Sequence, residues 1–322
     1  MIKPITLIIP SKSTENKITH LLKSITKQTF FPSEILLVNC SKIKYSTNKY
    51  FKNFCKSKGI KFKILKVNKM FPGAARNIGV RYSSNEIVAF LDINTIPVNN
   101  WLKNGYNLIT KSNKKIIWGT TIYKAENYFE KITRATTYGN KKIVTIPGTI
   151  LKKEIFNKIG LFLEHLRAGE DGDWFRRVKL HKTPSMINKN NLIYIGLKEL
   201  TILKLLKKWH RNYSISKNLG HLKNQKEIYY FSLIIMILLI AFNWNAFVAD
   251  WNMEKSTYLP HITKISLALM ISSYIFLRGV FIPLKKGVKL NFLLPLNFIP
   301  IVFLSILIDL IKVIAFLFPK NN

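Results

Sequence analysis

Short apolar runs alternate with amphipathic segments over the first hundred residues, and this alternation is the feature that most constrains the fold. The apolar runs are rich in β-branched residues and end at polar turns, which predicts buried strands at 5–10 (ITLIIP), 34–39 (EILLVN), 62–67 and 86–92 (EIVAFLD). Apolar residues at helical spacing predict helices between them, at 15–28, 46–58 and 73–82. Strands and helices that alternate in this way form parallel sheets with right-handed crossovers.

The pattern becomes mixed between residues 98 and 200. It predicts helices at 98–111, 153–159 and 171–180, and strands at 116–123 and 145–152. We therefore expect an α/β domain with a mostly parallel sheet over residues 1–200. Ligands of such sheets bind at the carboxyl ends of the strands. The segments that follow Pro10, Asn39 and Asp92 are where we expect the chemistry.

The last third of the chain is a region of a different kind. It contains three long apolar runs, at 228–249, 262–284 and 292–318, and the first is uncharged and long enough to span a bilayer. The third run contains Asp309 and Lys312, which stand three apart on one helical face and would partly neutralise each other. We expect about three hydrophobic helices over residues 228–322, with the alternative that the third lies in the membrane interface.

A basic amphipathic stretch precedes this region. In residues 201–227, leucines and Trp209 alternate at helical spacing with Lys204, Lys207, Lys208 and Arg211, which suits a helix on a membrane surface. An ordinary packed surface helix is the alternative. Lysines also gather in residues 285–291, and the positive-inside rule places both basic segments on the cytoplasmic side. With no signal peptide at its start, the chain is expected to be a multi-pass membrane protein with its N-terminal domain in the cytoplasm.

The net charge of +35 raises the question of nucleic-acid binding. The lysines are scattered, and the sequence has no zinc finger, RNP-type aromatic strand or Arg-rich tail, so we expect no nucleic-acid partner and favour an anionic membrane surface. The sequence also lacks a P-loop and a Gly-x-Gly-x-x-Gly after its first strand, which argues against a P-loop NTPase and a dinucleotide oxidoreductase. Cys40 and Cys55 have no metal-ligand spacing and are expected to be free and buried.

A specific resemblance appears in the order of several motifs. They are ITLIIPSKS, SITKQTF, EILLVNCSK, GAARNIGV, EIVAFLDINTIPVNNWL, GTILKKEIFNKIGLF and GEDGDWFRR. In this order and at these strand ends, they resemble the family-2 glycosyltransferases of GT-A fold over roughly residues 4–180. The resemblance implies a Rossmann-like catalytic domain that binds a nucleotide-sugar donor.

Asp92-Ile93-Asn94 stands where this family has an Asp-x-Asp motif. The resemblance implies that Asp92 and Asn94 hold Mg²⁺ or Mn²⁺, because hard cations prefer oxygen ligands and bridge the protein to a diphosphate. In the family the second acid is the usual ligand. Asn94 can still offer its amide oxygen but brings no negative charge. The alternative is that Asp92 only caps the turn into residues 95–97.

Residues 170–174 (EDGDW) resemble the acceptor-side motif of the family. The resemblance implies that Asp171 is the base that takes a proton from the acceptor hydroxyl, supported by Glu170, Asp173 and Trp174. A carboxylate crowded by other carboxylates has a raised pKa, which suits a general base. Acids also favour the start of a helix, so the motif has a structural interpretation as well.

The donor side is expected to involve residues at the strand ends and in the helix that begins near residue 73. The resemblance implies that the nucleotide contacts Pro10, Ser11, Asn39, Arg76, Asn77 and Asp92. Asn39 stands where the family usually has an Asp. The fork of Arg76 suits diphosphate oxygens, with a structural ion pair as the alternative.

Two functions follow from these observations. The first is an inverting glycosyltransferase that moves a sugar from a nucleotide-sugar donor to a membrane-linked acceptor in cell-envelope polysaccharide synthesis. That acceptor would be a polyprenyl-phosphate, a lipid-linked oligosaccharide or a glycolipid. The alternative is a catalytically impaired binding or scaffold subunit, suggested by the two amides Asn39 and Asn94. A transporter is disfavoured because three spans cannot form inverted repeats. The sequence makes no prediction of the oligomeric state.

Overall fold

The computed structural model describes residues 1–12, 15–40, 49–68, 70–188, 190, 192–216, 234–235 and 262–318. It divides the chain into two compact units. Unit 1 comprises residues 1–130 and 140–201, and unit 2 comprises residues 131–139 and 202–322. The sequence placed a boundary at residue 200, but nothing in it indicated that 131–139 belongs with the C-terminal unit.

Unit 1 is built on one mixed sheet of nine strands, in the order β3-β2-β1-β4-β7-β6-β9-β5, with β8 also paired to β6. The four strands β1 to β4 pair in parallel, whereas β7 runs antiparallel to both β4 and β6. The strand bounds are β1 Ile2–Ser11, β2 Phe31–Asn39, β3 Lys61–Lys66, β4 Ile87–Phe90, β5 Thr95–Pro97, β6 Ile116–Tyr123, β7 Ile143–Lys152, β8 Ser185–Ile187 and β9 Leu192–Tyr194. The mostly parallel sheet that the sequence predicted is confirmed.

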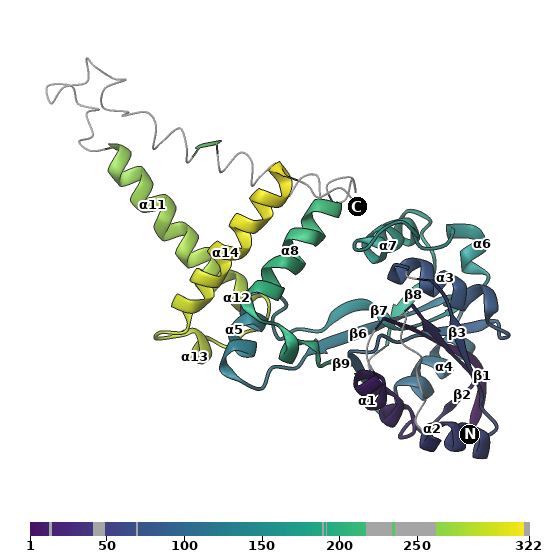
Figure 1. Ribbon diagram of the computed structural model, residues 1–322. Helices are drawn as coiled ribbons and strands as arrows, with labels where there is room; N and C mark the ends of the chain where they lie inside the picture. The colour runs from purple at the N-terminus through teal and green to yellow at the C-terminus, as the bar shows by residue number, and fades with distance from the viewer. Residues whose placement is uncertain are drawn as a thin grey trace, which may run out of the picture. The chain divides into compact units, whose positions relative to one another are not determined.

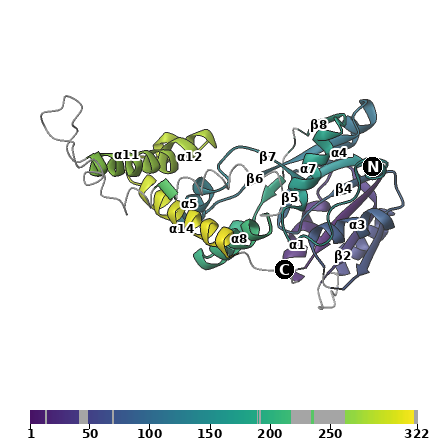
Figure 2. The ribbon, with the colours of Figure 1, turned by 90° about the horizontal axis from the view of Figure 1, so that it is seen from above.

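Helices cover both faces of this sheet (Figures 1 and 2). They are α1 Glu15–Ile25, α2 Lys49–Ser57, α3 Pro72–Tyr82, α4 Trp101–Lys111, α6 Ile155–Ile159, α7 Glu170–Leu180 and the 3₁₀ turn η1 Gly196–Glu199, while α5 (Tyr128–Thr136) runs from unit 1 into unit 2. Successive side chains of β1 point to opposite faces, as a strand requires. Leu7 and Ile9 join the core cluster under α1, α2 and α4, whereas Ile8 joins the cluster under α3, α6 and α7.

The sequence pattern located most of these elements to within a few residues. The short strands β5, β8 and β9 were not predicted, because three residues of strand carry no periodicity. Helix α5 was also not predicted, although its residues are amphipathic. Cys40 and Cys55 are free and buried, as expected. Burial raises the pKa of each thiol to about 11, which makes both unreactive at neutral pH.

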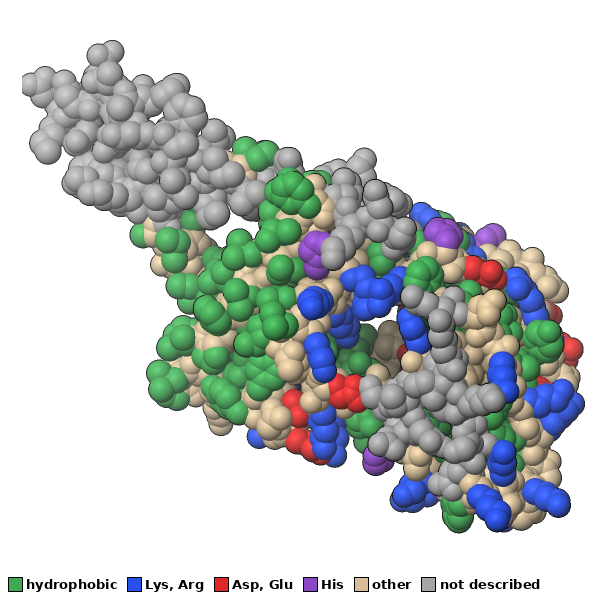
Figure 3. Space-filling model, in the orientation of Figure 1, with side chains coloured by type: hydrophobic (Ala, Val, Ile, Leu, Met, Phe, Trp, Pro, Cys, Tyr) green, Lys and Arg blue, Asp and Glu red, His purple; other side chains and the backbone are tan. Residues whose placement is uncertain are grey.

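Unit 2 is helical where it is described. Helix α8 (Ile202–Ser216) packs against α14 (Phe298–Leu317), and α14 also contacts the π-helical turn η3 (Leu277–Phe281). The turn continues α11 (Ile262–Phe276) and leads into α12 (Ile282–Lys285), and α13 (Leu290–Leu293) precedes α14. Hydrophobic side chains gather over these helices in the space-filling view (Figure 3). Exposed examples are Leu269, Phe276, Phe281, Phe303, Leu310 and Ile314.

Two of the described helices are long and apolar enough to cross a membrane. They are Ala268–Lys285, with a mean hydropathy of 1.4, and Phe298–Leu317, with a mean hydropathy of 2.5. The predicted run 228–249 lies outside the described residues apart from 234 and 235, and so does the end of the basic stretch 201–227. The predicted run 292–318 is helical from Phe298 onward, after Pro295. The predicted pair of Asp309 and Lys312 does form, with 2.9 Å between Oδ1 and Nζ.

Candidate active site

The carboxyl ends of the parallel strands bring several predicted residues to one edge of the sheet. Ser11 at the end of β1 pairs with Asn39 at the end of β2, and Ser11 accepts a backbone hydrogen bond from Cys40 at 2.8 Å. On the other side of β1, Ile8 pairs with Phe90 at the end of β4, which leads to Asp92. Pro10, Ser11, Asn39 and Asp92 therefore lie along the same edge, where α/β sheets bind ligands.

Arg76 is the centre of the site. Its side chain is 3% exposed and donates from Nη1 to Asp171 Oδ1 at 2.8 Å and to Glu170 Oε1 at 3.2 Å. Its Nη2 donates to Asp92 Oδ1 at 3.3 Å. Burial works to lower the pKa of Arg76, but Asp171, Asp92 and Glu170 raise it above its ordinary value. One buried guanidinium thus ties the start of α7 to the end of β4.

Asp171 has the pKa of a general base. Burial, with the negative charges of Glu170 and Asp92, raises the pKa of Asp171 to about 7, against the opposing effect of Arg76. The side chain nevertheless keeps 36% of its surface exposed, so a second molecule can reach it. Asp171 therefore holds or releases a proton near neutral pH at an accessible position.

The segment that precedes α7 is held against α3 by Asn77. Its Nδ2 donates to the Phe162 carbonyl at 2.8 Å and to Glu164 Oε1 at 2.9 Å, and its Oδ1 accepts from the Phe162 amide at 3.0 Å. A Cβ at Gly73 would lie 2.7 Å from the Leu163 carbonyl, so only glycine allows this approach. Asn77 is fully buried. The hydrogen bonds described for its side chain hold this loop in place, and none of them reaches the strand ends where the nucleotide was expected.

Two further residues of the EDGDW motif also have structural partners. Asp173 accepts from Arg177 Nε at 2.8 Å, and Arg177 in turn donates to the carbonyls of Ile159 and Leu161. Trp174 is fully buried, donates to the Gly160 carbonyl at 3.1 Å and stacks near Phe162. Glu170, by contrast, belongs to the Arg76 cluster. Asp173 and Trp174 fix helix α7, and through it Asp171.

Phe162 is a site residue that the sequence did not single out. Its ring lies beneath the guanidinium of Arg76, 5.6 Å from centroid to Cζ, and packs edge-on against Phe90. A cation over an aromatic face is stabilised when both are buried. The sequence did offer a signal for this residue, because Phe162 ends the motif GTILKKEIFNKIGLF directly after Gly160 and Leu161.

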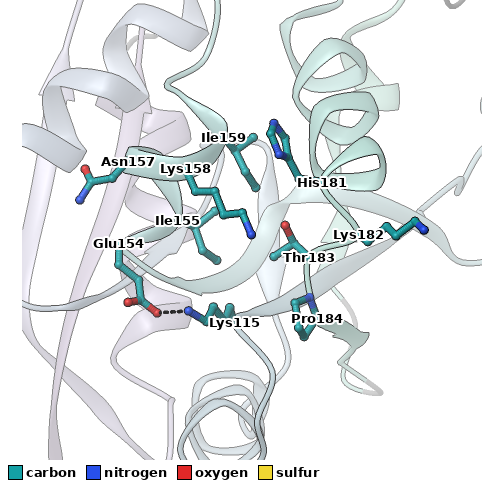
Figure 4. Close-up of a pocket in the computed structure, with 10 residues that line it drawn as sticks. All are labelled: Lys115, Glu154, Ile155, Asn157, Lys158, Ile159, His181, Lys182, Thr183 and Pro184. Atoms are coloured by element: carbon teal, nitrogen blue, oxygen red, sulfur yellow. Dashed lines mark ion pairs between the residues drawn. The ribbon is translucent and has the colours of Figure 1, made fainter.

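Unit 1 also has a cavity of about 400 Å³ on its surface (Figure 4). It is lined by α6 and by residues 181–184, which follow α7, and Lys158 extends across it toward His181 and Thr183. Lys115 and Glu154 form an ion pair at its rim, 2.9 Å apart. Asp171 lies in the first turn of α7 and the cavity beyond its last turn, so the cavity is not part of the Arg76 cluster.

The mixed sheet, with its acidic cluster at the carboxyl ends of the parallel strands, defines unit 1 as an α/β domain of the GT-A class. The sequence profile of "Glycosyl transferase family 2" matches residues 6–170, slightly more than half of the chain. The protein belongs to glycosyl transferase family 2.

Two relatives are similar in sequence. "Glycosyltransferase AglE" of Haloferax volcanii is 24% identical over 184 residues, which cover 54% of this chain and 60% of the relative. An "Uncharacterized glycosyltransferase" of Rickettsia bellii is 27% identical over 177 residues, which cover 52% of this chain and 25% of the relative. This chain therefore spans less than two thirds of the length of either relative.

Solved structures of S. aureus TarS are also similar. The structure of TarS 1–349 in complex with UDP-GlcNAc is 16% identical with a TM-score of 0.44, and the match covers 97% of this chain and 91% of that one. The structure of TarS 1–349 alone is 18% identical with a TM-score of 0.42, covering 68% and 66%.

Proposed function

We propose that the protein is an inverting glycosyltransferase that moves a sugar from a nucleotide-sugar donor to a membrane-linked acceptor. The observation that carries this proposal is Asp171, an accessible carboxylate with a pKa of about 7. It stands beside Asp92, at the sheet edge where a nucleotide binds. Membership of glycosyl transferase family 2 supports the same reaction class.

In this proposal Asp171 is the catalytic base. It takes the proton of the acceptor hydroxyl as that oxygen attacks the anomeric carbon, and the bond from this carbon to the diphosphate oxygen breaks with its electron pair on the diphosphate. Attack from the side opposite the leaving group inverts the anomeric centre. Arg76 orients Asp171 through the 2.8 Å bond and joins it to Asp92. In the same proposal the nucleotide contacts Pro10, Ser11 and Asn39.

The donor set suits a metal that is shared with substrate. Among the described residues no group of three His, Cys, Asp or Glu side chains is placed to hold a metal. Asp92 is 39% exposed, and of its two oxygens Oδ1 accepts from Arg76. One carboxylate and the Asn94 amide would hold Mg²⁺ or Mn²⁺ together with diphosphate oxygens and water, the usual arrangement for Mg²⁺. When bound, the metal neutralises charge on the departing diphosphate.

Unit 2 supplies the membrane attachment. Its two apolar helices and its basic segments support an arrangement in which the chain crosses the membrane more than once and unit 1 faces the cytoplasm. The acceptor would then be a polyprenyl-phosphate, a lipid-linked oligosaccharide or a glycolipid of cell-envelope synthesis. Nucleic acid is not a partner in this proposal.

The test is turnover of UDP- and GDP-sugars by the purified protein with a membrane lipid extract. We expect the wild type to release nucleotide and Asp171→Asn to lower the rate about 10²- to 10⁴-fold, the contribution of a general base. Glu154→Gln, which removes an exposed carboxylate remote from Asp171 in the same unit, is the matched control. A wild type that neither binds nor cleaves any nucleotide sugar would refute the proposal.

The alternative is a catalytically impaired scaffold subunit of the same fold. The amides Asn39 and Asn94 favour it, because they remove two negative charges that the family resemblance implies. Calorimetry of nucleotide-sugar binding with and without Mn²⁺ separates the two functions. Binding with no turnover by any acceptor extract would favour the scaffold.

A further inference from the structure

Unit 2 contains a cluster of charged side chains that the proposed reaction does not use. Asp309 of α14 accepts from Arg278 Nη2 at 2.9 Å, from Lys312 Nζ at 2.9 Å and from the Tyr274 hydroxyl at 3.0 Å. Lys286 lies close enough for its charge to interact with all three charged groups. We name Arg278, Lys286, Asp309 and Lys312 the cationic cluster.

Positive charge is in excess in this cluster. Three cations surround one described carboxylate. Burial, with the charges of Arg278 and Lys312, lowers the pKa of Lys286 to about 8, against the opposing effect of Asp309.

Two residues of the cluster and its immediate surroundings carry hydrogen-bond donors that no described acceptor satisfies. Arg278 Nε and Trp209 Nε1 are both buried without a hydrogen-bond partner. Trp209 belongs to the same site, since Lys312 Nζ lies 5.2 Å from its ring centroid and 5.2 Å from that of Tyr213. A buried N–H without an acceptor is costly, because it has lost its hydrogen bonds to water. Two such donors among surplus cations indicate an anionic acceptor.

The surroundings of the cluster indicate what carries the anion. Arg278 lies in the apolar helix Ala268–Lys285, and Asp309 and Lys312 lie in Phe298–Leu317. Large apolar side chains on these helices are exposed, among them Phe276, Phe281 and Leu310 (Figure 3). A free anion in water gains nothing from such a surface, whereas a hydrocarbon chain is stabilised by covering it.

We infer that the cationic cluster binds the phosphate group of a membrane lipid whose hydrocarbon chain lies along the exposed apolar helices. Arg278, Lys286 and Lys312 would supply the charge, and Arg278 Nε and Trp209 Nε1 would donate to phosphate oxygens. This inference deepens the proposed function. It rests on that function only for the statement that the bound lipid phosphate is the sugar acceptor or is part of the lipid that carries the acceptor. The binding itself does not depend on that step.

A purely structural ion network is the competing explanation. It accounts for the bonds of Asp309, but it predicts a balanced cluster, because an excess of buried charge is costly. It also leaves the two donors unsatisfied. The lipid-phosphate site explains both features.

The experiment is calorimetric titration of the full chain in dodecyl maltoside micelles with dodecyl phosphate, inorganic phosphate and dodecanol. We expect saturable binding of dodecyl phosphate, at least about tenfold tighter than that of either other probe. Lys286→Gln should weaken it at least about tenfold, and Lys286→Arg should restore it. Lys285→Gln, the same change at the exposed neighbouring residue, should alter it less than about twofold.

Equal losses in Lys285→Gln and Lys286→Gln, or dodecyl phosphate binding no tighter than dodecanol, would overturn the site. Inorganic phosphate binding as tightly as dodecyl phosphate would assign the cluster to a free anion and overturn the lipid. Nucleotide-sugar binding, measured on the same samples, should be unchanged in Lys286→Gln, which excludes misfolding. If the wild type binds dodecyl phosphate but no nucleotide sugar, the proposed function fails and the lipid site stands; the opposite result defeats the lipid site alone.

Discussion

Each unit contains a cluster of charges held around one buried side chain, and the two clusters have opposite composition. In unit 1 a single guanidinium, Arg76, is shared by three carboxylates. In unit 2 a single carboxylate, Asp309, is shared by Arg278 and Lys312, with Lys286 nearby. The pKa values shift in opposite directions: burial and the neighbouring acids raise the pKa of Asp171 against the effect of Arg76, and burial and the neighbouring bases lower the pKa of Lys286 against the effect of Asp309.

In our proposals both clusters serve binding, and their unequal charge is what separates them from an ion network that serves stability alone. A stabilising network approaches neutrality, because uncompensated charge in a low-dielectric surrounding is costly. A network with a surplus of one charge is balanced when it binds a ligand of the opposite charge. In our proposals this is a proton or a metal with its diphosphate for the acidic cluster, and a phosphate for the cationic cluster.

The largest effect is expected from removing the shared cation of unit 1. Arg76→Gln leaves three carboxylates without their counter-ion, which should lower the free energy of unfolding by about 3–5 kcal/mol. Chemical denaturation of the full chain measures it. Arg81→Gln on the same helix is the matched control, since Arg81 is 54% exposed and pairs only at the surface with Glu164, so its loss should cost less than about 1 kcal/mol. Equal losses would remove the distinction between a central and a peripheral cation.

This cluster also shows how far the sequence reached. The strand ends that carry Ser11, Asn39 and Asp92 follow from the alternating pattern, because parallel strands place their carboxyl ends on one edge. The sequence pattern does not predict that Arg76 joins Asp92 to Asp171. Arg76 and Asp171 are 95 residues apart, and their contact depends on how the loop at Phe162 packs. Local spacing contains no information on such a contact.

The cationic cluster was only partly predictable, for the same reason. The pair Asp309 and Lys312 is three residues apart, and the sequence predicted it. Arg278 is 31 residues from Asp309, and Lys286 donates to backbone carbonyls of Thr136 and Thr137 in a segment that the sequence assigned to the other domain. Helix packing, not periodicity, assembles the cluster.

The second prediction concerns pH. A base must be deprotonated, so with a pKa of about 7 for Asp171 the value of kcat/KM should fall about tenfold per pH unit below pH 6 and level off above pH 8. The folded state keeps this proton while the unfolded chain, with an ordinary value of 3.8, has released it. Asp171 therefore makes stability decrease as pH rises from about 4 to 7. A pH–rate profile that is flat from pH 5 to 8 would contradict the role of Asp171.

The third prediction removes the shared carboxylate of unit 2. Asp309→Asn keeps the size of the side chain but deletes the anion that competes with a bound phosphate, so affinity for dodecyl phosphate should rise by about fivefold or more. Calorimetry in neutral micelles measures it, and dodecanol binding should stay unchanged. Weaker binding would mean that Asp309 mainly positions Arg278 and Lys312. The single carboxylate of unit 2 would then not compete with the bound ligand, and the comparison of the two clusters by their charge alone would fail.

The smallest effect is expected from the same kind of change in unit 1. Glu170→Gln also deletes one negative charge, but here that charge raises the pKa of Asp171. The acid limb of the pH–rate profile should move to lower pH, so that at pH 6 the rate relative to its plateau rises about twofold. Glu164→Gln, an exposed carboxylate on the loop before α7, should leave the limb in place. A limb that moves upward in Glu170→Gln would show that Glu170 acts mainly by holding Arg76 in place, because a displaced guanidinium no longer favours the ionised form of Asp171.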